Sequence, residues 1–81
     1  MKYFVKSTLT ATENNPNFAG ETQIWFTGKA GKTDHSPKFI EGWSRKYFAE
    51  KYIKDCIEWN EQYELNHPKY WNSTFEVIEA A

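Results

Sequence analysis

Hydrophobic and polar residues alternate along residues 2–12, and this period of two predicts a β-strand with one face turned to a core. The threonine and aromatic content of the segment suits a pleated, half-buried surface. One face of this strand consists of Tyr3, Val5, Ser7, Leu9 and Ala11. The other face consists of Lys2, Phe4, Lys6, Thr8, Thr10 and Thr12.

A turn and a second strand follow. Residues 13–20 contain Asn-Asn-Pro-Asn, which favours a loop because asparagine stabilises turns and Pro16 cannot donate to a sheet. The alternation then returns in residues 21–28. One face carries Thr22, Ile24 and Phe26, and the other carries Gln23, Trp25 and Thr27. A loop of this length makes the two strands an antiparallel hairpin.

A long helix is predicted from Ser44 to about Glu64, because no Gly or Pro interrupts this stretch and Ser44 suits an N-cap. Asn66 and Pro68 are expected to end it. Its less polar residues sweep a continuous face of roughly 180°, wider than the ~100° stripe of an ordinary surface helix. That face consists of Phe48, Ala49, Tyr52, Ile53, Cys56, Ile57, Trp59, Asn60 and Tyr63.

The remaining segments complete the predicted fold. Residues 28–37 form a loop rich in Gly, Lys, Asp and Ser, whereas residues 39–43 fit an extended connector and a turn of helix equally well. Residues 71–78 alternate again and supply a last strand. The expected fold is therefore α+β of ββαβ type, in a single domain spanning residues 1–81. If the last strand pairs beside the first, three antiparallel strands lie in the order 2-1-3, with the helix packed on one face.

Composition indicates how so short a chain holds together. Four Trp, five Tyr and six Phe among 81 residues supply large side chains for a small core. Cys56 is the single cysteine, so no disulfide forms within the chain, and one Cys with two distant His does not match a zinc site. No apolar run reaches the length of a signal peptide or membrane span, which makes the cytoplasm the expected location.

The distribution of charge is uneven although the net charge is −1. Residues 29–54 carry seven Lys or Arg against three acids, whereas residues 55–81 carry one Lys against six acids. Within the helix the basic half comes first, the reverse of what the helix dipole favours. An antiparallel second copy of the helix would place basic half against acidic half, which suggests a homodimer.

Motifs of enzyme chemistry are incomplete in this sequence. The run Gly28 to Thr33 ends in Gly-Lys-Thr, but the first glycine of a phosphate-binding loop would fall at Phe26, inside a strand. Cys56 lies within the apolar helix face, and nothing in the sequence brings His35 or His67 to it as a base. The protein is therefore not expected to be an enzyme, and no catalytic, cofactor-binding or metal-binding residue is assigned.

Four segments resemble small uncharacterised ββαβ proteins of bacterial genomes and prophages. The segments are KYFVKS, QIWFTG, WSRKYFAEKYIKD with its Ala49-Glu50 pair, and FEVIE. The resemblance spans most of the chain and implies the fold and a mobile-element origin. It implies no activity and no site.

Two hypotheses for function follow. The first is a non-enzymatic interaction module that binds a protein partner or itself through the helix. Its contact residues would be Phe48, Tyr52, Trp59 and Tyr63, with Lys51 and Glu58 as a charged rim. The alternative is single-stranded nucleic-acid binding on the sheet face away from the helix, where aromatic rings would stack on bases beside lysines. Its residues would be Phe4, Lys6, Trp25, Lys29 and Lys32.

Overall fold

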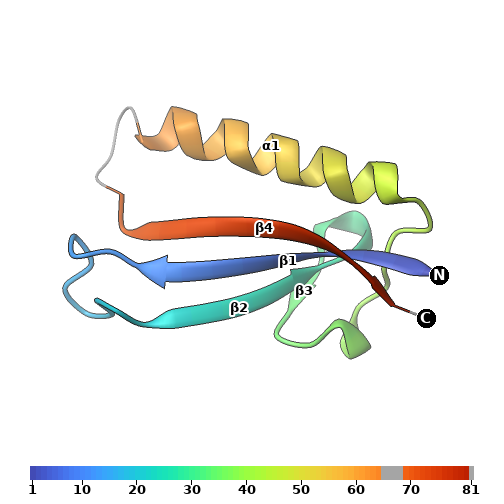
Figure 1. Cartoon of the computed structure of the whole chain (residues 1–81), viewed down its shortest axis with the longest axis horizontal. Coiled ribbons are helices and arrows are strands. Elements are labelled where there is room, and N and C mark those ends of the chain that lie inside the picture. Colours follow the sequence, from blue (N-terminus) through green and yellow to red (C-terminus); the bar gives the residue numbers. More distant parts are fainter. Residues whose placement is uncertain (65–68, 81) are drawn as a thin grey trace.

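The computed structural model describes residues 1–64 and 69–80, with the backbone alone for residues 63 and 64. Its strands are β1 (Lys2–Ala11), β2 (Thr22–Thr27), β3 (Thr33–Asp34) and β4 (Trp71–Ala80), and its α-helix is α1 (Lys46–Glu64). Two short 3-10 helices, η1 (Lys29–Gly31) and η2 (Pro37–Phe39), lie between β2 and α1. Figure 1 shows α1 running along an open antiparallel sheet. The predicted α+β class is confirmed.

The sheet has the strand order β3-β2-β1-β4. The predicted order 2-1-3 recurs as its β2-β1-β4 part, but the predicted count of three strands is wrong because β3 pairs outside β2. β3 forms because the Gly28 N–H donates to the Lys32 carbonyl (2.9 Å) and reverses the chain, which brings Thr33 opposite Thr27. A strand of two residues cannot show the alternation by which strands are predicted.

The register of the three long strands sets their two faces. Val5 pairs with Thr27 on β2 and with Val77 on β4. Residues directly opposite one another point to the same side of a sheet, so the odd-numbered residues of these strands face α1. Val5 is 0% exposed and Thr27 is 2% exposed, which places the core beneath the helix. The alternation predicted for both hairpin strands is confirmed.

The connector from η2 to α1 covers part of the opposite face. Trp43 and Tyr3 exchange two backbone hydrogen bonds of 2.8 and 2.9 Å, so Trp43 forms a single bridge to β1. A Cβ atom on Gly42 would lie 2.8 Å from the Phe4 ring, and this close approach leaves Phe4 only 4% exposed. Of the segment 39–43, Phe39 ends the 3-10 helix η2 and the rest forms an extended connector.

The helix begins one residue later than an N-cap at Ser44 predicts. Its first residue is Lys46, and the Phe48 N–H donates to the carbonyl of Arg45 (3.2 Å) rather than capping on Ser44. Because the chain is bonded to β1 through Trp43, it needs two residues to leave the sheet before it can coil. The predicted end at Asn66 and Pro68 lies outside the described residues.

α1 packs mainly on β1 and β4, and it buries a narrower stripe than the sequence suggested. Ala49 is fully buried, and four neighbours on the same side are half-buried: Tyr52, Ile53, Cys56 and Asn60. The flanks of the predicted face stay open, with Phe48 and Ile57 each 45% exposed and Trp59 68% exposed. One helix cannot cover the whole sheet. The face of β2 that is turned to the helix side therefore stays partly uncovered, next to the exposed flank of α1.

Candidate functional site in the groove between α1 and β2

A groove of about 380 Å³ lies where α1 leaves β2 uncovered. We call it the α1–β2 groove. Its floor consists of residues from β1 and β4: Ser7, Leu9, Ser73 and Phe75. The wall on the sheet side consists of Trp25, Thr27 and Thr33. The wall on the helix side consists of Tyr52, Asp55, Cys56, Trp59 and Asn60. The volume falls within the range of pockets that bind small molecules or side chains.

Trp25 is held in a fixed orientation on the sheet wall. Its indole Nε1–H donates to the Gln23 side chain (3.3 Å), and the ring of His35 stacks on it with centroids 3.8 Å apart. His35 is itself positioned by Nδ1, which lies 2.9 Å from the Ile24 carbonyl oxygen. His35 is exposed to solvent, and β3 brings its ring against the indole. A preoriented aromatic ring loses little conformational entropy when a partner packs on it.

Trp59 forms the outer part of the helix wall. It lies on the same flank of α1 as Phe48, three turns along, and 68% of it is exposed. An indole this exposed is unusual, because a Trp side chain offers about 150–250 Å² for burial. Trp59 therefore leaves a large apolar surface beside the groove without a contact that buries it.

Tyr52 closes the inner part of the groove. Its phenol is hydrogen-bonded to the side chains of Thr27 and Cys56, and its ring packs on Trp43 with centroids 5.6 Å apart. Burial raises the pKa of Tyr52 above its ordinary value of 10.0, because desolvation disfavours the phenolate. The hydrogen bond from Thr27 opposes this shift, and Cys56 adds to it. The phenol is thus a neutral group at physiological pH.

The electrostatic character of the groove comes from Asp55. It is the one carboxylate among the lining residues, and none of them is Lys or Arg. Asp55 forms no ion pair with any residue that the structure describes. Its charge, next to aromatic faces whose own quadrupoles are negative, makes the groove favourable for a cation and unfavourable for a phosphate.

The structure divides the residues predicted for protein binding. It brings Tyr52 and Trp59 together in the groove, and Phe48 lies in a separate hollow with Trp43 and Lys29. The charged rim of Lys51 and Glu58 is on the outward side of α1, with Tyr47. The side chain of Tyr63 lies outside the described residues.

The predicted nucleic-acid face is wrong in its geometry. The register pairs Ser7 with Trp25 but Lys6 with Phe26, so Trp25 points to the helix side while Lys6 and Phe4 point away from it. Phe4 is also buried beneath Gly42 and offers no ring for stacking. Lys29 and Lys32 lie in the turn at the end of β2, outside the α1–β2 groove. These five residues therefore form no common surface.

Two further observations concern other kinds of site. Cys56 lies in the groove, but its hydrogen-bond partner is Tyr52, whereas His35 bonds to the backbone of Ile24. The described residues contain no group of three His, Cys, Asp or Glu side chains arranged to hold a metal ion. Within the same part of the chain, no helix has the length and apolar character needed to cross a membrane.

No family model, no curated protein and no solved structure matches this chain. The interpretation of this site therefore rests on the chemistry of its residues.

Proposed function

We propose that this domain is a non-enzymatic interaction module that binds a protein partner in the α1–β2 groove. The partner inserts a Lys or Arg side chain against Trp25 and Trp59, beside Asp55. The observation that carries this proposal is the lining of the groove: two indoles, a neutral phenol and one carboxylate, with no basic group among them. Cations bind over indole faces, and interface hot spots are enriched in Trp and Tyr.

The exposed area of Trp59 provides a sufficient driving force. With 68% of the residue exposed, its burial removes about 100–170 Å² of indole surface from water and contributes about 2.5–4 kcal/mol before the cost of association. A cation over the ring adds about 0.5–2 kcal/mol. These magnitudes are those of a central hot spot in a protein interface.

Single-stranded nucleic acid is less well supported as the ligand. Trp25 and Trp59 offer stacking surfaces, but Asp55 beside them repels phosphate. The lysines predicted to accompany Trp25 lie elsewhere, so the electrostatic part of such binding is missing at the groove. A cytoplasmic location and an origin among mobile elements stay predictions.

Selection from a random peptide library displayed on phage tests the proposal. We expect enriched peptides to contain Lys or Arg. We expect Asp55→Asn to weaken their binding by about 2–30-fold and Trp59→Ala, which also removes the indole surface buried on binding, to weaken it by about 60-fold or more. Phe39→Ala is the matched control, because Phe39 is 78% exposed but does not line the groove. Enriched peptides that bind both groove variants normally would show that the groove is not the site. Enriched peptides that lack a positive charge would refute the inserted Lys or Arg. A labelled oligothymidylate that bound with a steep salt dependence would favour the nucleic-acid alternative instead.

A further inference from the structure

The strand β4 presents a long edge with free backbone groups. It pairs with β1 along all ten of its residues, and the described part of the chain places no strand on its other side. Natural edge strands usually carry a proline, a lysine or a bulge that prevents pairing with other chains. β4, with the sequence WNSTFEVIEA, has no proline, lysine or bulge, and its register with β1 is continuous. Its charged residues are Glu76 and Glu79, which disfavour pairing with an acidic strand.

The hydrogen-bond pattern shows which residues of β4 are available. The Thr12 N–H donates to the Tyr70 carbonyl (2.9 Å), and hydrogen-bonded pairs recur at every second residue of an antiparallel ladder. The even-numbered residues of β4 therefore bond to β1. The N–H and C=O groups that point outward belong to Trp71, Ser73, Phe75, Val77 and Glu79. The side chains of these same residues lie on the α1 side of the sheet.

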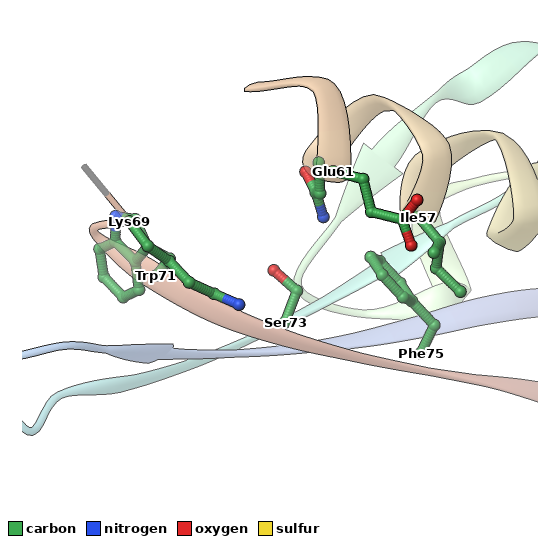
Figure 2. A pocket seen from close by; sticks show the side chains of 7 residues that line it. Ile57, Glu61, Lys69, Trp71, Ser73 and Phe75 are labelled. Atoms are coloured by element: carbon green, nitrogen blue, oxygen red, sulfur yellow. The ribbon is translucent and has the colours of Figure 1, made fainter. Parts of the chain in front are cut away.

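A hollow of about 270 Å³ lies directly above this edge, under the flank of α1 (Figure 2). It is lined by Ile57, Asn60, Glu61, Lys69, Trp71, Ser73 and Phe75. Figure 2 shows Phe75 rising from β4 beside Ile57, with the small Ser73 between Phe75 and Trp71. Ile57 is 45% exposed and gives the hollow an apolar wall. Because the side chain of Ser73 is small, the hollow has space for the side chain of a bound segment opposite it.

We infer that the outer edge of β4 is a strand-addition site for an extended segment of another protein, in which apolar side chains alternate with Lys or Arg. Residues opposite Ser73 and Phe75 form backbone hydrogen bonds to β4 and place apolar side chains in the hollow against Ile57. The basic residues follow from charge complementarity. Glu76, opposite Lys6 of β1, is an exposed acid on the sheet face away from α1, the face to which the basic residues of the segment turn. Glu79 on β4 and Glu61 on α1 are exposed acids on the α1 side, with Lys69 at one end. The hollow shares Asn60, Ser73 and Phe75 with the α1–β2 groove. The strand-addition proposal rests on the outward backbone groups of β4, which the groove proposal does not use.

Amide hydrogen exchange, measured by NMR on the whole chain, tests this inference. The probe is the end-capped peptide Lys-Val-Lys-Val-Lys-Val-Lys. At ten times the Kd of the peptide, we expect exchange at Ser73, Phe75 and Val77 to slow by about tenfold. Exchange at Thr74 and Glu76, whose N–H groups already bond to β1, should not change. A basic peptide that merely attaches to acidic side chains cannot produce this alternation, so its absence would overturn the inference.

A backbone-modified probe separates strand addition from side-chain binding without altering the protein. N-methylation of the valines, whose N–H groups face β4, should abolish the protection. The matched control is N-methylation of the inner lysines, whose N–H groups face away, and it should leave protection intact. Equal binding of both methylated peptides would refute strand addition. If protection of Ser73 and Phe75 rises with protein concentration when no peptide is present, a second copy of the chain occupies the edge. That result would overturn the inference that the occupant is a basic segment of another protein.

Discussion

Replacing Tyr52 by Phe removes one hydroxyl from the inner wall of the α1–β2 groove. Thr27 is 2% exposed, and its hydroxyl is hydrogen-bonded to the Tyr52 phenol, so the variant leaves a buried hydroxyl without that partner. An unsatisfied buried polar group costs about 1–3 kcal/mol. In a domain of this size we therefore expect the Tm to fall by roughly 4–24 °C.

A double-mutant cycle distinguishes this hydrogen bond from simple loss of packing. Thr27→Val removes the other partner, and the double variant Thr27→Val with Tyr52→Phe leaves neither group unsatisfied. We expect the double variant to be more stable than the sum of the two single effects allows, by about 0.5–1.5 kcal/mol. Urea unfolding followed by circular dichroism measures all four proteins. If the two single effects on the free energy of unfolding add exactly, the hydrogen bond between Tyr52 and Thr27 is refuted. The position of α1 over β2 that this bond implies would then be wrong as well.

The pH dependence of the same residue provides an independent test. Since burial raises the pKa of Tyr52 in the folded protein, the unfolded chain releases the phenolic proton first as the pH rises through 10.0. The free energy of unfolding therefore falls in this alkaline range, and the contribution of Tyr52 is fully present below it. In this range, the free energy of unfolding of Tyr52→Phe should decrease less steeply with rising pH than that of the wild type. Equal slopes would mean that the phenol is not desolvated.

Three further substitutions test other parts of the structure. Gly28→Ala should destabilise the fold by at least about 1–3 kcal/mol, because its Cβ would overlap the backbone carbonyl of Glu41; normal stability would refute that contact. Ala30→Gly should stabilise the fold by about 1 kcal/mol, because Ala30 has a φ of 62°; a loss of stability would contradict this turn geometry. Trp59→Ala should change the free energy of unfolding by less than about 1 kcal/mol, because the side chain is mostly exposed; a larger loss would show that Trp59 belongs to the core.

The sequence predicts the hairpin and the helix well because both have strong periodic patterns. Alternation along β1 and β2 determines which side chains share a face. It does not determine which face α1 covers, because aromatic residues occur on both: Phe4 and Phe26 on one side, Trp25 on the other. The helix covers the Trp25 side, and the connector with Gly42 covers Phe4. That connector shows no periodic pattern, which is why the predicted nucleic-acid face failed.

The prediction of the helix face was limited by a different cause. Helical periodicity identifies which residues are apolar enough to be buried, but it gives no information on how much sheet is available to bury them. Tyr52 and Trp59 were found in this way, whereas Asp55 was missed because it carries a charge at the margin of the apolar face. His35 was missed because its position depends on β3, which is too short to predict.

Both proposed surfaces follow from one structural imbalance. A single helix packs mainly on β1 and β4, so its two flanks and the two outer parts of the sheet stay uncovered. On one side the flank with Trp59 overlooks β2, and on the other the flank with Ile57 overlooks the edge of β4. Neither Trp59 nor Ile57 is buried, so these two apolar side chains contribute little to the core of the fold. The proposed partners would cover the apolar surface that the helix leaves open at these two positions.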